Sequence, residues 1–385
     1  MSEVSEEIYK FEIDIPEADI EDLRVRLGNT RWPDAEIPDD WSQGVPLKYH
    51  QEFCQYWASK YDWYETQDRL NTFPQFKSNF DGLNIHFMHV KSKEKAARPL
   101  IITHGWPGSI VEFCKVIGPL IDPVTHGGKA EDAFHVVCPS LPGFGFSDKP
   151  TAIGWGVTKI AEVWDQLMRR LGYEQYFAQG GDWGAAVTTT IGLQNLGACS
   201  AIHVNMPSAP PTKAALENPN EKDKRALAGV TFYQQWDSGY SKQQSTRPQT
   251  LGYGLADSPA GQAGWILEKF YAWTDCDGHP ENTFTRDELL DNIMFYWLPN
   301  NGASSARLYW ESFAKSFGNQ ENLVQLPTGC SIFPKEIVAT PRSWAEQRYN
   351  NIQYWNELEQ GGHFAAFEQP DLFVTELRKC FSTIG

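Results

Sequence analysis

The stretch from Tyr173 to Ala186, YEQYFAQGGDWGAA, constrains the fold of this chain more than any other. It reads as a short buried strand, a tight turn through Gly-Gly-Asp-Trp-Gly, and a helix that begins near Ala185. Side chains beside so sharp a turn would collide with the adjoining strand and helix, so glycine suits positions 180 and 184. The residue at the tip of the turn is Asp182.

Asp182 occupies the central position of a small-x-nucleophile-x-small pattern, which is the nucleophile elbow of α/β-hydrolases. Esterases and lipases have serine there, so the aspartate at 182 excludes a serine esterase. A carboxylate at a helix N-terminus is favoured in its ionised form by the unpaired N–H groups and the helix dipole. Taken alone, the same residues fit an acidic turn that caps a helix equally well. The rest of the chain decides between the two interpretations.

Strand-like and helix-like segments alternate along most of the chain. The strand-like runs cover residues 83–90, 99–103, 134–138, 201–204, 328–333 and 352–355, and helical stretches over 110–120 and 158–171 lie between them. This alternation predicts right-handed βαβ units and a mostly parallel, twisted sheet flanked by helices. It stops after Met206, where helical stretches such as 264–274 and 286–296 have no strand between them. Helices inserted at that point would cover the carboxyl ends of the strands, where open α/β sheets bind ligands.

The sequence therefore predicts an α/β-hydrolase fold in three parts. Residues 1–80 form an N-terminal meander that wraps the core and the cap, with helices near 20–28 and 47–60 and several prolines. Residues 81–206 and 325–385 form the core, which ends in a helix over about 364–381. Residues 207–324 form a helical cap, or lid, domain.

Composition and charge limit the partners and the compartment. The 385 residues carry a formal net charge of -16, which argues against nucleic acid or an anionic membrane surface as partner. The seven cysteines are scattered, with no CxxC pair or Cys/His cluster, so neither a disulfide framework nor a metal site is indicated. The acidic start MSEVSEEIYK is unlike a signal peptide, and no run approaches the roughly 18 apolar residues of a membrane span. We expect a soluble, cytoplasmic protein, whose size and fold are compatible with a homodimer.

A catalytic elbow needs an acid and then a histidine later in the chain, in the order nucleophile, acid, base. Among nine histidines, His363 alone combines a late position, a loop after a strand and preceding glycines. Glu336, in FPKE, follows the resumed strand and is the natural carboxylate to orient the imidazole. A satisfied structural histidine and an exposed loop glutamate are the alternative interpretations, and Asp275, Asp277 and Asp287 are alternative acids.

An oxyanion hole is predicted beside the elbow. His104-Gly105-Trp106-Pro107 follows an apolar strand, and in this fold the turn after that strand supplies one N–H to the hole. The expected donors are the backbone N–H of Trp106 and that of Trp183, the residue after the nucleophile. An ordinary Gly/Pro turn is the alternative.

Several short motifs occur in a specific order along nearly the whole chain. They are RWPD, FPQF, HGWPGS, PSLPGFGFS, GGDWGA, SGY, DSPAG, ASSARLY, FPKE and GGHFAAFEQP. Together they resemble the epoxide hydrolases of the microsomal and juvenile-hormone type, within the α/β-hydrolase superfamily. The resemblance implies that Asp182 is the nucleophile, His363 the base and Glu336 its orienting acid. Members of the microsomal type carry a membrane anchor ahead of the meander, so this chain is expected to be a soluble microbial relative.

The same resemblance implies that two cap tyrosines, Tyr240 in SGY and Tyr309 in ARLY, bind the epoxide oxygen. The implied activity converts small apolar epoxides and water to vicinal diols through an ester on Asp182, without cofactor or metal. A carboxylate suits this chemistry because an ester keeps a carbonyl that water can attack, whereas a serine would form an ether. A haloalkane dehalogenase, which also has an Asp nucleophile followed by Trp, is the closest alternative, and the tyrosines and the meander argue against it. A ligand receptor without catalytic activity is the second alternative.

Overall fold

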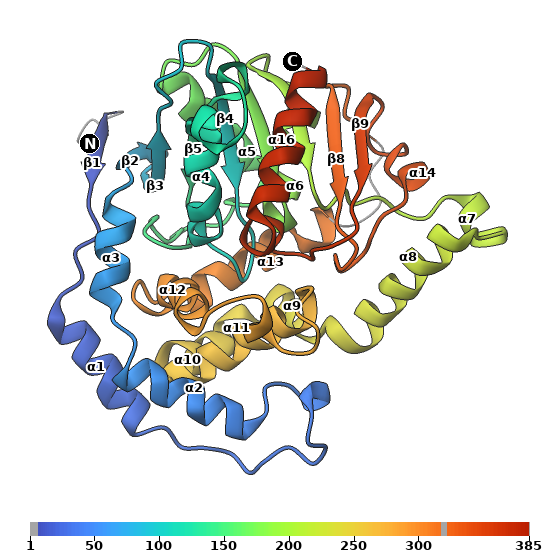
Figure 1. Ribbon diagram of the computed structural model, residues 1–385. Coiled ribbons are helices and arrows are strands. Elements are labelled where there is room, and N and C mark those ends of the chain that lie inside the picture. The colour runs from blue at the N-terminus through green and yellow to red at the C-terminus, as the bar shows by residue number, and fades with distance from the viewer. Residues whose placement is uncertain (1–6, 317–321, 385) are drawn as a thin grey trace.

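A nine-stranded sheet forms the centre of the protein, in the order β1-β2-β3-β5-β4-β6-β7-β8-β9 (Figure 1). The computed structural model describes residues 7–316 and 322–384. The strands are β1 (Ile8–Phe11), β2 (Gln75–Phe80), β3 (Leu83–Val90), β4 (Arg98–Thr103), β5 (Phe134–Pro139), β6 (Tyr176–Gly180), β7 (Cys199–Val204), β8 (Thr328–Ile332) and β9 (Ile352–Glu357). The exchange of β4 and β5 in this order marks a crossover, as parallel strands joined by helices require.

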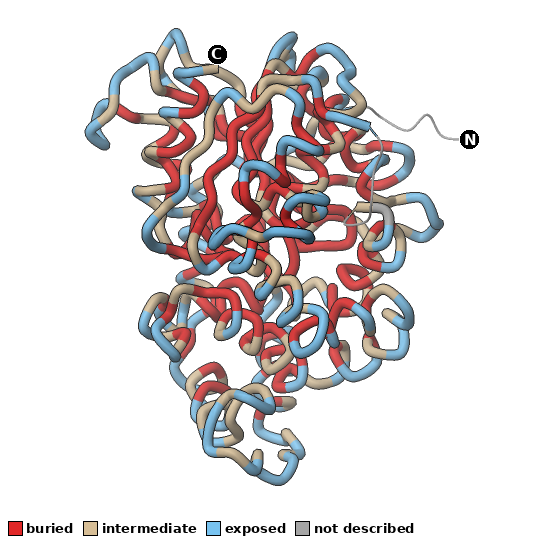
Figure 2. Tube along the Cα trace, turned by 90° about the vertical axis from the view of Figure 1, so that its right-hand side faces the viewer, coloured by how far each residue is buried: buried red, intermediate tan, exposed pale blue. Residues whose placement is uncertain are grey.

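The sheet is mostly parallel, which confirms the prediction. Pairing is parallel from β5 through β4, β6, β7 and β8 to β9, whereas β1, β2, β3 and β5 pair antiparallel. The central strands β4, β5 and β6 are apolar and mostly buried, as expected of parallel strands with helices on both faces. Figure 2 shows the buried chain running through the middle of the molecule, with exposed residues at its periphery.

Helices cover the sheet. They are α4 (Cys114–Ile121), α5 (Val157–Arg170), α6 (Asp182–Gln194), α15 (Ala365–Glu368) and α16 (Pro370–Ile384). α6 contacts β4, β6 and β7, and α16 contacts β7, β8 and β9. The helix predicted from residue 110 begins as a 3-10 turn, η2 (Ile110–Phe113). The single final helix predicted over 364–381 is instead divided, because α16 starts afresh at Pro370, whose missing N–H suits a first helical position.

The N-terminal segment is more structured than a meander. Besides the two predicted helices, α1 (Glu17–Gly28) and α2 (Leu47–Ser59), it contains α3 (Trp63–Asn71) and the strands β1 and β2, which the sequence pattern did not indicate. The buried face of α3 includes the polar residues Thr66 and Gln67. Gln67 Oε1 accepts the Ile15 N–H at 2.9 Å, a partner that hydrophobic periodicity alone cannot reveal.

Helices are inserted between β7 and β8, and most of them lie between the sheet and α1–α2, whereas the first two extend to one side (Figure 1). We call them the inserted helices: α7 (Lys213–Glu217), α8 (Glu221–Phe232), the π-helical turn η5 (Tyr233–Asp237), α9 (Gly239–Thr246), α10 (Pro248–Asp257), α11 (Pro259–Trp273), α12 (Arg286–Trp297) and α13 (Gly302–Ser316). The described part of this segment contains no named strand, as predicted. The remaining short elements are η1 (Trp41–Gln43), η3 (Pro123–His126), η4 (Ala130–Asp132), η6 (Pro280–Asn282) and α14 (Arg342–Ala345).

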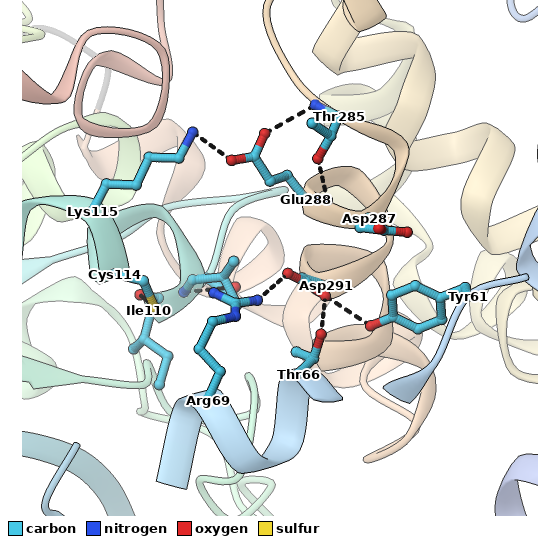
Figure 3. Close-up of polar contacts among 12 residues, drawn as sticks. Tyr61, Thr66, Arg69, Ile110, Cys114, Lys115, Thr285, Asp287, Glu288 and Asp291 are labelled. Carbon is cyan, nitrogen blue, oxygen red and sulfur yellow. Dashed lines mark hydrogen bonds and ion pairs between the residues drawn. The ribbon is translucent and has the colours of Figure 1, made fainter. Parts of the chain in front are cut away.

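Polar contacts of α12 join the inserted helices to the N-terminal segment and to the core (Figure 3). The buried carboxylate of Asp291 accepts hydrogen bonds from Tyr61 Oη (2.8 Å) and Thr66 Oγ1 (2.6 Å), and it forms an ion pair with Arg69. Glu288, one turn earlier, pairs with Lys115 of α4 at 2.5 Å. These bonds tie together the N-terminal segment, the inserted helices and the core.

Candidate active site

The elbow places Asp182 at the first position of α6, directly after β6. Its φ angle is 50°, in the left-handed region that residues other than glycine adopt at a cost, so the tertiary structure holds it there. A Cβ atom at Gly184 would lie 1.9 Å from the Thr103 carbonyl oxygen, and one at Gly180 would lie 2.1 Å from the backbone of Gly184. Both glycines are therefore sterically required, as the sequence predicted.

The His-Gly-Trp-Pro turn lies against the Asp182 carboxylate. The Trp106 backbone N–H donates to Asp182 Oδ1 at 2.8 Å, and glycine at 105 leaves room for that oxygen, since a Cβ there would approach it to 2.1 Å. Trp183, the second predicted donor, follows Asp182 in α6, and its ring is fully buried. The turn thus brings one backbone N–H to the Asp182 carboxylate, which is the arrangement that an oxyanion hole requires.

His104 in the same turn has a supporting role. Its Nε2 accepts the Leu141 N–H at 3.1 Å, so Nδ1 carries the proton and donates to the Gly105 carbonyl at 2.9 Å. Burial lowers the pKa of His104 to about 4, which keeps the ring neutral. This histidine joins the turn after β4 to the PSLPGFG loop after β5 rather than to a substrate.

The predicted histidine and acid meet at the elbow. His363 Nε2 lies 3.4 Å from Asp182 Oδ2, and His363 Nδ1 donates to Glu336 Oε1 at 2.5 Å. Both side chains are buried, and Glu336 Oε1 also accepts the Ile337 N–H at 2.8 Å. Burial alone would lower the pKa of His363, but the charges of Glu336 and Asp182 outweigh it and raise that pKa well above its ordinary value.

The alternative acids lie elsewhere. Asp275 accepts the Gly361 N–H at 3.0 Å, so it supports the histidine loop and not the imidazole. Asp287 accepts from Tyr56 at 2.8 Å, at the contact with the N-terminal segment. Asp277 is an exposed turn residue with φ of 47°. Of the four candidates, Glu336 is the one whose carboxylate contacts the imidazole.

Two buried glutamates near the site were missed by sequence reasoning. Glu368 accepts the backbone N–H groups of Gly362, Phe364 and Asp275 at 2.8–2.9 Å, and so fixes the loop that carries His363. Burial raises the pKa of Glu368 to about 7 and that of Glu112, in η2, to about 8. The signal for Glu368 was its place five residues after the histidine, in GGHFAAFE, where it could bond back to the loop.

The two predicted tyrosines approach the elbow from the inserted helices. Tyr240 of α9 stacks on Trp106 with ring centroids 4.9 Å apart, and Tyr309 of α13 meets Trp183 edge-on at 4.7 Å. The two phenol rings are 5.7 Å apart, and both are buried. Burial, together with nearby charge that includes Asp182, raises the pKa of both phenols well above the ordinary value, so they stay protonated as donors.

A cavity of about 460 Å³ lies over Asp182, between the core and the inserted helices. Its walls are mainly apolar and include Met206, Pro207, Val230, Phe313, Ile337, Val338 and Trp344. Its polar lining residues include Ser208, Tyr233, Gln234, Ser238, Tyr240, Ser241, Lys242, Tyr309 and Thr340. A volume of this order accommodates a drug-sized molecule. A second, much smaller cavity of about 20 Å³ is lined by Asp182, His363 and Glu112.

The fold and the site can be compared with known proteins. The family described as "Epoxide hydrolase N terminus" matches residues 8–113, and the family described as "alpha/beta hydrolase fold" matches residues 98–240. The chain is 52% identical to a candidate epoxide hydrolase of Stigmatella aurantiaca, over 97% of this chain and 84% of that protein. It is 35% identical to Epoxide hydrolase 1 of Sus scrofa, over 97% and 88% of the two chains. The crystal structure of the juvenile hormone epoxide hydrolase from the silkworm Bombyx mori matches with a TM-score of 0.91 and 33% identity, covering 98% of this chain and 95% of that one.

Two further observations concern cofactors and membranes. Within residues 7–316 and 322–384, no group of three or more His, Cys, Asp or Glu side chains could hold a metal ion. No helix in the described part of the chain is long and apolar enough to cross a membrane.

The similarity to known epoxide hydrolases extends over nearly the full length of the chain and includes the N-terminal segment, the sheet and the inserted helices. This chain therefore belongs to the epoxide hydrolase family of the α/β-hydrolase fold.

Proposed function

We propose that the protein hydrolyses apolar epoxides to vicinal diols in two steps, with Asp182 as the nucleophile. The observation that carries this proposal is the position of Asp182, with one carboxylate oxygen held by the Trp106 N–H and the other facing His363 beneath the cavity. Because Oδ1 is engaged by Trp106, Oδ2 is the oxygen that attacks the epoxide carbon. The mainly apolar cavity walls favour a hydrocarbon substituent on the epoxide.

In the first step the epoxide ring opens by backside displacement. The C–O bond breaks as the bond from Asp182 Oδ2 to carbon forms, and negative charge develops on the leaving oxygen. Tyr240 and Tyr309, neutral and directed at the same cavity, donate hydrogen bonds and then a proton to that oxygen. The product of this step is an alkyl ester of Asp182.

In the second step water cleaves the ester. The cavity of about 20 Å³ beside Asp182 and His363 has room for one water molecule. Ester formation removes the carboxylate charge of Asp182, which is one cause of the raised pKa of His363, so the imidazolium can pass its proton to the phenolate left by ring opening and then act as base toward water. The oxyanion then forms at Oδ1, where the Trp106 N–H already lies and where we place the Trp183 N–H as second donor. A donor of this kind typically contributes about 3 kcal/mol. As the intermediate collapses, the bond from Cγ to the alkyl oxygen breaks, and that oxygen takes the proton that the imidazole gained from water and leaves as a hydroxyl of the diol.

The three parts predicted from the sequence have separate roles in this proposal. Residues 81–206 and 325–385 supply the nucleophile, the base and the oxyanion donor. Residues 207–324 act as the cap that supplies the two tyrosines and most of the apolar wall. Residues 1–80 wrap around both and brace the cap through the bonds to Asp291. A cytoplasmic location and a homodimer stay predictions, which cell fractionation and sedimentation of the purified protein would test.

A single-turnover reaction in heavy-oxygen water tests the covalent step. With enzyme in excess over styrene, terpene or aliphatic epoxides, the new diol oxygen should come from Asp182, so label should appear in the protein and not in the first diol. Label in the first diol would contradict an ester intermediate. Halide release from haloalkanes, with no diol from any epoxide, would instead indicate a dehalogenase.

Two variants test the assigned roles. Asp182→Ala should abolish diol formation without loss of the fold. His363→Gln should stop at the ester, seen in the intact-protein mass as an increase equal to the mass of the substrate. His126→Gln, at an exposed position in η3, is the matched control and should turn over like the parent. Normal turnover by His363→Gln would show that another group is the base.

A further inference from the structure

A third tyrosine, Tyr233, lies in the cavity beside the two that the sequence predicted. It opens the π-helical turn η5 between α8 and α9, and π-helical turns recur at functional sites. Its hydroxyl is 3.3 Å from that of Tyr240, and the two rings meet edge-on with centroids 6.4 Å apart. Tyr233 therefore contacts the reacting region through Tyr240.

The hydroxyl of Tyr233 belongs to a chain of bonds with a fixed direction. Tyr233 Oη donates to Ser241 Oγ at 3.0 Å, and Ser241, which is fully buried, donates to the Ser238 carbonyl oxygen at 2.9 Å. Each hydroxyl has a single proton, and a carbonyl can only accept. The proton of Tyr233 is thus engaged by Ser241, so the bond between the two phenols is donated by Tyr240.

A hydrogen bond donated by Tyr240 to Tyr233 is unsuited to catalysis, since the proton of Tyr240 then points away from an epoxide. Rotation of the two hydroxyl groups about their C–O bonds, one in Tyr233 and one in Tyr240, reverses this bond. If Tyr233 turns its O–H from Ser241 to Tyr240 Oη, the proton of Tyr240 is free for the epoxide oxygen. Ser241 keeps its bond to Ser238, so its single proton stays paired and only its oxygen loses a partner.

We propose that Tyr233 is a positioning residue for ring opening, which switches its hydrogen bond from Ser241 to Tyr240 when an epoxide occupies the cavity. No proton changes owner in the switch itself. As the leaving oxygen takes a proton from Tyr240, negative charge develops on Tyr240 Oη, and the bond from Tyr233 stabilises it. Hydrogen bonds in such chains strengthen one another. The inference rests on the proposed role of Tyr240 in the first step.

The test measures the rate of ester formation by rapid mixing, with the fastest substrate among styrene, terpene and aliphatic epoxides. Tyr233→Phe should slow ester formation roughly tenfold or more, as expected for the loss of one hydrogen bond to a group that gains charge. The same change should have no effect when Tyr240→Phe is already present, and its full effect when Tyr309→Phe is present. An unchanged thermal midpoint checks that each variant is folded.

The outcomes separate this inference from the proposed function. If Tyr240→Phe itself leaves ester formation unchanged, the assignment of Tyr240 as donor fails, and the inference fails with it. If Tyr240→Phe slows the step but Tyr233→Phe does not, only the inference fails. If Tyr233→Phe slows ester formation equally in the parent protein and in the Tyr240→Phe variant, the role of Tyr233 is structural, and the inference is also overturned.

Ser241→Ala provides an independent check, because it removes the competing acceptor. Tyr233 should then donate to Tyr240 at all times, so ester formation should be at least as fast as in the parent protein. A loss as large as that of Tyr233→Phe would mean that the chain only holds Tyr233 in place, and the switch would be refuted.

Discussion

The bond between His363 and Glu336 permits a quantitative prediction for Glu336→Gln. The glutamine keeps the shape of the side chain but removes its charge, at a position where Oε1 accepts from His363 Nδ1 at 2.5 Å. Hydrogen bonds to charged groups contribute about 1.5–3 kcal/mol, so ester hydrolysis should slow by roughly tenfold to hundredfold. Ring opening should be unaffected, because it depends on Asp182 and the tyrosines. The ester should therefore accumulate during turnover.

The pH dependence of the same variant gives a second readout. Hydrolysis requires neutral imidazole, so its rate rises with pH through the pKa of His363. The charge of Glu336 raises that pKa, and its removal should move the acid limb of the profile to lower pH while the plateau falls. Rapid quenching with intact-protein mass analysis over a series of pH values measures both effects. Glu346→Gln, an exposed partner of Arg342, is the matched control. An unshifted limb, or equal slowing of ring opening, would refute this reasoning.

Three further predictions concern stability. Gly184→Ala should destabilise the fold by at least about 3 kcal/mol, because its Cβ would meet a carbonyl oxygen at 1.9 Å, whereas Gly254→Ala, which faces open space, should be harmless in the same denaturant titration. Lys269→Met should cost about 3–5 kcal/mol, since the buried Asp237, 2.8 Å from the ammonium, would lose its partner, and an unchanged urea midpoint would contradict this. Burial raises the pKa of Glu112 from 4.5 to about 8, so the folded state loses stability as the pH rises from 4.5 to about 8. Glu112→Gln should remove this loss. The difference between the thermal midpoint of this variant and that of the parent protein should therefore grow, in favour of the variant, as the pH approaches 8.

Some features of the candidate site were predictable because they depend on local sequence. The glycines at 180 and 184 were identified from the turn alone, since steric contact within a strand-turn-helix unit involves residues close in the chain. The order of Asp182, Glu336 and His363 followed from the connectivity of a doubly wound sheet, in which loops after parallel strands meet at one edge. The inserted helices were evident from the interruption of the strand pattern.

Other features could not be predicted, because their partners are distant in sequence or belong to the backbone. Glu368 and Glu112 read as ordinary charged residues, yet tertiary packing buries both beside the site and raises the pKa of each. α3 escaped detection because Thr66 and Gln67 on its buried face are satisfied by Asp291 and by the backbone of Ile15. The spacing of apolar residues along a sequence reveals the buried face of a helix or strand only where the side chains on that face are apolar.

The sequence by itself determined the alternation of strands and helices, the strained turn that presents Asp182, and the order of the residues that surround it. The resemblance singled out Tyr240 and Tyr309 among fifteen tyrosines, but only the tertiary structure showed that Tyr233 joins them in the cavity over Asp182, because η5, α9 and α13 meet there through packing between distant segments. The tertiary structure also decided the direction of the hydroxyl chain from Tyr240 through Tyr233 to Ser241. Local steric rules can be read along a chain, whereas the electrostatic environment of a buried group depends on everything that packs around it.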